Sequence, residues 1–113
     1  MKKMILVLCG LFVTSSVALA HPPSDIKIQF DEKTKTLTAV VTHHVSNPKT
    51  HYIKKVDIGL NGKEIKELPF TKQEKNALQT VEIVLPEVKK GDILSVEGYC
   101  NLSGKLEKEI KVS

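Results

Sequence analysis

Five side chains in this 113-residue sequence could bind a transition metal together. They are four histidines and one cysteine: His21, His43, His44, His51 and Cys100. Imidazole nitrogens bind iron, copper and zinc, and a thiolate adds a soft ligand that donates strongly to the metal. The five residues are too widely spaced for a local motif, so a site forms only if the fold brings distant segments together. The alternative is that the histidines are solvent-exposed and Cys100 is an inert buried side chain.

The first part of the chain, residues 1–20, has the pattern of a Sec-type signal peptide. Two lysines precede an apolar run over residues 4–13, and Ala18-Leu19-Ala20 is a small-residue cleavage signature. The apolar run is shorter than the roughly 20 residues that cross a bilayer. We therefore expect cleavage before His21, a periplasmic or secreted product, and no membrane association after cleavage.

The mature chain, residues 21–113, has the length of one domain. Cys9 is expected to leave with the signal peptide, which leaves Cys100 without a disulfide partner in its own chain. A domain of this size builds a modest hydrophobic core, which a bound metal would help to stabilise.

The charged residues argue against nucleic acid as a partner. The formal net charge is +4, and it falls to +2 without the two lysines of the signal peptide. All 17 basic residues are lysines, and aromatic residues make up 4% of the chain. Arginine forks and stacking aromatic rings are the usual means of reading phosphates and bases. The lysines are therefore expected to form solvated strand faces.

The mature sequence predicts β-strands throughout and no helix. Apolar and polar residues alternate with the two-residue period of half-buried strands. The predicted strands cover residues 26–30, 36–43, 51–60, 63–68, 81–85, 93–99 and 106–112. Asn61-Gly62 is a strong hairpin signal, Asn47-Pro48 predicts a turn, and residues 69–77 read as a polar loop. About seven short strands indicate an all-β fold, an immunoglobulin-like antiparallel β-sandwich.

His43 and His44 lie at the end of one predicted strand. Neighbouring side chains of a strand point to opposite faces, so both can reach one metal only across a bulge or bend. His43 is in phase with the apolar residues of the strand, which favours His43 as the inward side chain.

Three short motifs, in this order, resemble the iron domain of the superoxide reductase family (desulfoferrodoxin, neelaredoxin). His21-Pro22-Pro23 is similar to the family's "H-x-P" opening. His51-Tyr52-Ile53 resembles its "H-Y-I" segment, and Cys100-Asn101-Leu102-Ser103-Gly104 resembles its "C-N-x-H-G" element. His44 stands where a loop with a histidine precedes the tyrosine segment.

The resemblance implies a sandwich that holds one exposed mononuclear iron, Fe2+ or Fe3+. In that family four histidines bind the iron in one plane, a cysteine binds axially, and superoxide is reduced to hydrogen peroxide at the open position. Carried over by position, His21, His44 and His51 are equatorial ligands and Cys100 is the axial ligand. His43 stays open as an alternative or additional ligand.

Two positions differ from the family's pattern. Ser103 stands where the family has its fourth histidine, and a hydroxyl replaces imidazole poorly, so altered or reduced activity is expected. The family's lysine before the first histidine corresponds to Ala20. Lys49, in the loop before His51, is a candidate for the cation that attracts superoxide, although a solvated loop lysine is the commoner role.

The sequence also indicates which protein partners to expect. The sequence contains no rubredoxin-like domain with paired cysteines, so electrons would come from a separate donor protein. Exposed edge strands of a sandwich can pair, which leaves a homo-oligomer open.

A second hypothesis is a non-catalytic metal-binding module. Copper would be bound by the imidazole and the free α-amine of an N-terminal His21. The reference pKa of an α-amine is about 8, so part of it is neutral and able to bind. A sandwich that has lost its metal is the remaining alternative.

Overall fold

The computed structural model describes residues 21–113, and the expected signal peptide lies outside this range. The described chain forms seven β-strands: β1 (Asp25–Asp31), β2 (Thr36–Thr42), β3 (Ile53–Leu60), β4 (Lys63–Pro69), β5 (Leu78–Val84), β6 (Ile93–Cys100) and β7 (Lys105–Lys111). Over residues 21–113 there is no helix long and apolar enough to cross a membrane.

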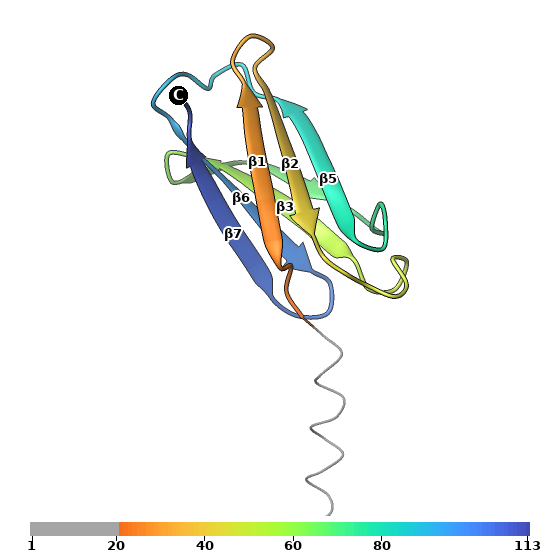
Figure 1. Ribbon diagram of the computed structural model, residues 1–113. Coiled ribbons are helices and arrows are strands. Elements are labelled where there is room, and N and C mark those ends of the chain that lie inside the picture. Colours follow the sequence, from red (N-terminus) through yellow and green to blue (C-terminus); the bar gives the residue numbers. More distant parts are fainter. Residues whose placement is uncertain (1–20) are drawn as a thin grey trace, which may run out of the picture.

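The strands form two antiparallel sheets. One has the order β1-β2-β5 and the other the order β4-β3-β6-β7. The two sheets lie face to face as two layers (Figure 1). This confirms the predicted immunoglobulin-like sandwich. In this sandwich β4 pairs with β3 and belongs to the four-stranded sheet.

The core lies between the sheets, where the central strands β2 and β6 bury every second side chain. In β2, Leu37, Ala39 and Val41 are fully buried, and in β6 the same holds for Leu94 and Val96. Burying a side chain of the size of leucine or valine stabilises a fold by about 1.5–3 kcal/mol. The alternation in the sequence is therefore the packing pattern of the sandwich.

The Asn61-Gly62 hairpin forms as predicted. Both residues have positive φ angles, 52° and 88°, as a tight two-residue turn between β3 and β4 requires. The Asn61 side chain also accepts a hydrogen bond from the Ile93 amide at 2.8 Å and donates one to Asp92 Oδ1 at 3.1 Å. This turn is thereby fixed to the start of β6.

Several strand ends differ from the sequence prediction by one to three residues, and two of these differences concern histidines. β2 ends at Thr42, and His43 follows it with its amide bonded to the Ala77 carbonyl at 2.8 Å. β3 begins at Ile53, because the amide of His51 is used in a turn, where it donates to the Asn47 carbonyl at 3.0 Å. The start of β1, the end of β2, the start of β3 and the end of β6 share one end of the sandwich.

Candidate metal centre

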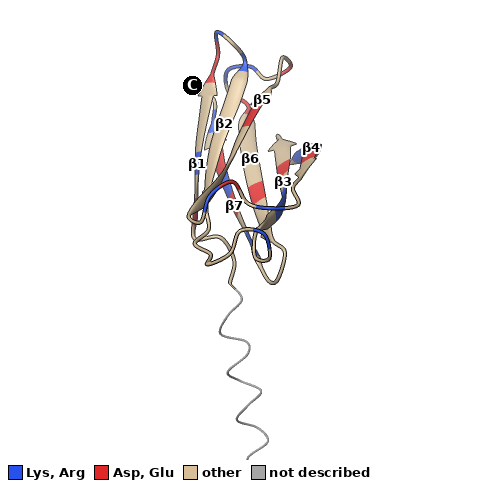
Figure 2. Ribbon diagram, turned by 90° about the vertical axis from the view of Figure 1, so that its right-hand side faces the viewer, with Lys and Arg blue, Asp and Glu red and all other residues tan. Residues whose placement is uncertain are grey.

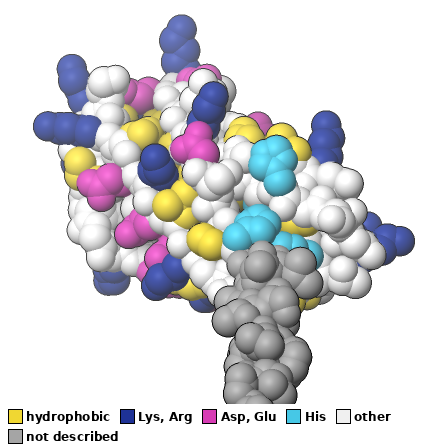
Figure 3. Space-filling model, turned by 60° about the horizontal axis from the view of Figure 1, so that its bottom comes forward, with side chains coloured by type: hydrophobic (Ala, Val, Ile, Leu, Met, Phe, Trp, Pro, Cys, Tyr) yellow, Lys and Arg dark blue, Asp and Glu magenta, His cyan; other side chains and the backbone are white. Residues whose placement is uncertain are grey.

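Three histidines meet at this end of the sandwich. His21 precedes β1, His43 follows β2, and His51 precedes β3. One ring nitrogen from each lies within 4.8 Å of those of the other two. The ring centroids form a nearly equilateral triangle, with separations of 4.8, 5.0 and 4.8 Å. Figure 3 brings this end forward and shows histidine side chains, in cyan, gathered on it.

His43 is the fully buried member of this three-histidine cluster. Its Nδ1 atom lies 2.9 Å from Oε1 of Gln73, and its Nε2 atom lies 3.2 Å from the carbonyl oxygen of His21. His43 directly follows β2, and its side chain points inward because the alternation of buried side chains in β2 continues to this residue. An imidazole in such a place has one nitrogen held by the protein and a second that can face a ligand.

His51 carries an unsatisfied nitrogen. Its Nε2 atom is buried and has no hydrogen-bond partner, although an orphaned buried polar atom is costly. Burial lowers the pKa of His51 below the ordinary 6.5, and the nearby rings of His43 and His21 lower it further. A neutral imidazole with a free nitrogen is the form that binds a metal. The three imidazoles therefore fit a transition-metal ion.

His21 is half-buried and fixes the N-terminal segment. Its ring nitrogens lie 3.0 Å from the carbonyl oxygens of Pro22 and His44. The segment packs on the loop after β6, where a Cβ added to Gly104 would lie 2.7 Å from Cβ of Pro22. Metal binding by His21 would replace one of the two carbonyl contacts.

The two adjacent histidines are separated by the fold. His43 belongs to the cluster, whereas His44 is exposed and reaches it through its carbonyl oxygen, which contacts His21. The structure thus brings His21, His43 and His51 together. The roles of these residues as ligands stay predictions.

Cys100 is buried at the same end, with 4% of its surface exposed. It ends β6 opposite Ile53, two residues along the chain from His51. Its sulfur accepts a hydrogen bond from the Leu102 amide at 3.4 Å. The sulfur is outside the set of mutually close atoms that the three histidines form.

Asn101 joins the cysteine loop to the histidine loop. Its Oδ1 accepts the Tyr52 amide at 2.8 Å, its Nδ2 donates to the Thr50 carbonyl at 3.1 Å, and its own amide donates to the Tyr52 carbonyl at 2.9 Å. These bonds hold the main chain on both sides of His51.

The remaining sequence candidates lie in exposed loops. Ser103 is exposed in the loop between β6 and β7. Lys49 is exposed in the turn before His51, where its amide donates to Oδ1 of Asn47 at 3.0 Å. The Asn47-Pro48 turn signal was therefore correct, and it positions His51.

Gln73 is a site residue that the sequence did not single out. It lies in the segment read as a polar loop, yet it is 3% exposed and contacts His43. Loop residues have no periodicity that separates inward from outward side chains, so no signal in the sequence could have found it.

A second group of candidate ligands lies elsewhere, on the outer face of the four-stranded sheet. Asp57, Glu64 and Glu67 each offer a carboxylate oxygen within 4.8 Å of the others. The ammonium group of Lys55 lies 3.4 Å from Asp57 Oδ2 and 3.6 Å from Glu67 Oε1. Basic and acidic segments accordingly lie side by side on β3 and β4 (Figure 2). We assign these carboxylates to ion pairing.

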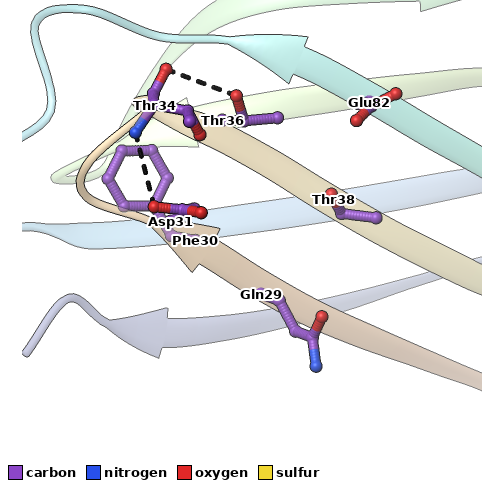
Figure 4. Close-up of a pocket in the computed structure, with 7 residues that line it drawn as sticks. All are labelled: Gln29, Phe30, Asp31, Thr34, Thr36, Thr38 and Glu82. Atoms are coloured by element: carbon purple, nitrogen blue, oxygen red, sulfur yellow. Dashed lines mark hydrogen bonds between the residues drawn. The ribbon is translucent and has the colours of Figure 1, made fainter.

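An open depression of about 600 Å³ lies at the opposite end of the β1–β2 hairpin from His43 (Figure 4). Gln29, Thr36, Thr38 and Glu82 line it along the strands. At its end Asp31 accepts the amides of Lys33 and Thr34, as a turn-forming aspartate does. Neither histidine nor cysteine lines this depression, so it has no part in the metal centre.

Compared with known proteins, the sequence matches no protein-family model and no curated protein. Among the similar solved structures are two variants of the superoxide reductase (neelaredoxin) from Ignicoccus hospitalis. One is 26% identical, covers 87% of this chain and 85% of its own, and has a TM-score of 0.50. The other is 24% identical, with coverages of 89% and 87% and a TM-score of 0.48.

The chain therefore has a superoxide-reductase-like fold, as its three motifs indicated. This fold carries a histidine-rich potential metal site at one end.

Proposed function

We propose that this protein is an exported, superoxide-reductase-like mononuclear iron protein. The proposed reaction is the one-electron reduction of superoxide, with uptake of two protons, to hydrogen peroxide. Iron, when bound, supplies that electron from its ferrous form, and a separate donor protein returns it. The observation that carries the proposal is the meeting of three imidazoles, one with an orphaned buried nitrogen, on a superoxide-reductase-like sandwich.

The residues of the chain have separate roles in this proposal. His21, His43 and His51 hold the metal through nitrogen, and Cys100 adds its sulfur, which accepts a hydrogen bond from the Leu102 amide. A thiolate is the softest and most strongly donating of these ligands. The buried side of the site, around His43, keeps water from the ligands, while Lys49 on the exposed side adds positive charge for an incoming anion.

The test begins with metal content. The full chain is expressed, and the exported protein is purified anaerobically and reconstituted with Fe2+. We expect one iron per chain and, after oxidation, a visible thiolate-to-iron band. Cys100→Ala should abolish this band and leave iron bound by the histidines with reduced affinity. Protein that neither carries nor takes up iron would contradict the proposal.

The reaction is tested by rapid mixing of the ferrous protein with superoxide. A reductase converts each superoxide to one hydrogen peroxide without releasing dioxygen, whereas a dismutase releases dioxygen from half of it. Unchanged decay of superoxide in the presence of the iron-loaded protein would also contradict the proposal. Mass spectrometry of the exported protein tests the cleavage before His21.

Copper is the second candidate, because three close imidazoles suit copper as well as iron. If the mature chain begins at His21, its α-amine adds a fourth nitrogen to the site. Copper binding should then weaken when the amine is blocked by acetylation, while iron binding should not. Equal copper affinity of the blocked and free proteins would exclude this role of the amine.

A further inference from the structure

We propose that Gln73 is a positioning residue that fixes the Nδ1 proton of His43 and thereby turns the free lone pair at Nε2 toward the metal. This inference rests on the proposed metal-binding function. It adds Gln73, a residue that lies outside the three sequence motifs.

The hydrogen bonds of Gln73 leave one orientation for its amide. The Ile53 amide, which can act as a donor alone, lies 3.1 Å from one end of the group, which must therefore be the oxygen. At the other end the carbonyls of His43 and Lys75 lie at 2.7 and 2.9 Å, and carbonyls need a donor. The amide nitrogen therefore faces the two carbonyls.

This orientation decides the proton on His43. Its Nδ1 atom lies 2.9 Å from the oxygen of Gln73, an acceptor, so Nδ1 must carry a proton and donate. In a neutral imidazole Nε2 is then the unprotonated nitrogen, which is the form that a metal ligand needs.

A competing contact shows why Gln73 is needed. Nε2 of His43 lies 3.2 Å from the carbonyl of His21, which would favour a proton on Nε2 instead. That tautomer would leave Nδ1 facing the oxygen of Gln73 without a proton. Turning the amide of Gln73 to compensate would break its bonds to Ile53, His43 and Lys75. The shorter and more numerous bonds of Gln73 therefore decide the tautomer.

Gln73 also couples the segments that carry two of the histidines. Its side chain bonds the main chain at His43 and at Ile53, two residues after His51, and its own amide donates to the Pro48 carbonyl at 2.9 Å. Gln73 is only 3% exposed, so water does not compete for these bonds. One side chain thus sets both the proton and the position of the ligand.

The experiment reads the tautomer directly. The ring nitrogens of His43 are observed by 15N NMR in the metal-free full chain at about pH 8, above the ordinary histidine pKa of about 6.5. Gln73→Met removes the hydrogen bonds at similar volume, and Gln73→Glu keeps the acceptor but not the donor. Gln79→Met is the matched control. Gln79 is also buried, and its side chain bonds Glu74 and Thr80 rather than His43.

We expect a proton on Nδ1 in the wild type, in Gln73→Glu and in Gln79→Met, and a switch to Nε2 in Gln73→Met. Metal affinity should fall by about 10- to 100-fold in Gln73→Met, the usual effect of losing such a partner, and by less in Gln73→Glu. Melting temperatures show whether each variant is folded. Comparing Gln73→Met with Gln79→Met separates the effect of lost stability from the effect of a changed proton position on His43.

A wild type with its proton on Nε2, or an unchanged tautomer in folded Gln73→Met, would overturn the proposal. An equal loss of metal affinity in Gln79→Met would overturn it too, because the effect would then be general destabilisation. A tautomer switch in a protein whose wild type binds no metal would support the role of Gln73 and contradict the proposed function instead.

Discussion

The side chain of Asn101 bonds the main chain on both sides of His51. Its oxygen accepts the Tyr52 amide and its nitrogen donates to the Thr50 carbonyl, so the histidine is held between two hydrogen bonds from the residue next to Cys100. The segments carrying the two candidate ligands are therefore joined by side-chain hydrogen bonds.

Asn101→Ala should loosen this connection. Two lost hydrogen bonds of about 1 kcal/mol each predict a free energy of unfolding lower by about 1–2 kcal/mol, measured by denaturant titration. Metal affinity should fall as well, because His51 is no longer held. Asn76→Ala removes an exposed asparagine of the loop before β5 and serves as the control. Equal metal affinity in the two variants would contradict the coupling.

The strands were predictable because their signal is local. Alternation buries Leu37, Ala39 and Val41 on one face of β2, and the Asn61-Gly62 turn has the two positive φ angles that the dipeptide favours. Such patterns depend on neighbours in the sequence, so one sequence suffices to read them.

The site was predictable in part, since its geometry depends on contacts between distant segments. The inward phase of His43 followed from the alternation, but the contact of His43 with Gln73 spans 30 residues and has no local signal. The separation of His43 from His44 depends on how the chain continues after β2, where the His43 amide bonds the carbonyl of Ala77 in the loop before β5.

The adjacent histidines provide a matched pair for metal binding. His43→Gln removes a buried member of the cluster, and His44→Gln removes an exposed side chain one residue away. We expect metal affinity to fall by about tenfold or more, equivalent to about 1.4 kcal/mol, in His43→Gln and to stay unchanged in His44→Gln. Titration calorimetry with Fe2+ measures both. The reverse order would assign the ligand to His44, the position that the family motif indicates.

Gly104 keeps the loop after β6 close to the first histidine. Gly104→Ala would place a Cβ 2.7 Å from Cβ of Pro22, and the residue has a φ of +86°. Gly62→Ala has a similar φ of +88° with open space around it, so it carries the backbone cost of about 1 kcal/mol alone. Gly104→Ala should therefore melt at a lower temperature than Gly62→Ala, and it should also bind metal more weakly. Equal losses of stability would show that the contact with Pro22 is unimportant.

Asp92 predicts a pH dependence that is independent of the metal site. The Lys89 amide at 2.9 Å and the Asn61 side chain at 3.1 Å donate to its carboxylate, and these bonds lower the pKa of Asp92 below 3.8. At pH values between the lowered pKa of the folded state and the ordinary pKa, the unfolded chain therefore binds more protons than the folded chain. The stabilisation is complete above about pH 3.8 and is lost as the pH falls through the lower pKa of the folded state.

Asp92→Asn should consequently flatten the acid side of the stability curve, measured by denaturant unfolding at a series of pH values. Glu82→Gln removes an exposed carboxylate on β5 and should leave the curve parallel to that of the wild type. An acid limb as steep in Asp92→Asn as in the wild type would rule out this role of Asp92.

Ser103 offers a gain-of-function test of the metal centre. It is exposed three residues after Cys100, in a loop that Asn101 fixes to the His51 segment and Gly104 packs against Pro22. Ser103→His restores the residue that the superoxide reductase motif has at this position. Metal affinity should then rise by about tenfold or more, about 1.4 kcal/mol, and the iron-loaded variant should consume superoxide faster. Leu102→His adds the same imidazole at an adjacent position that is 54% exposed, and it controls for nonspecific binding by a new surface histidine. Equal gains at both positions would mean that the loop does not direct residue 103 to the metal, whereas a gain confined to Ser103→His places the fourth ligand position in this loop.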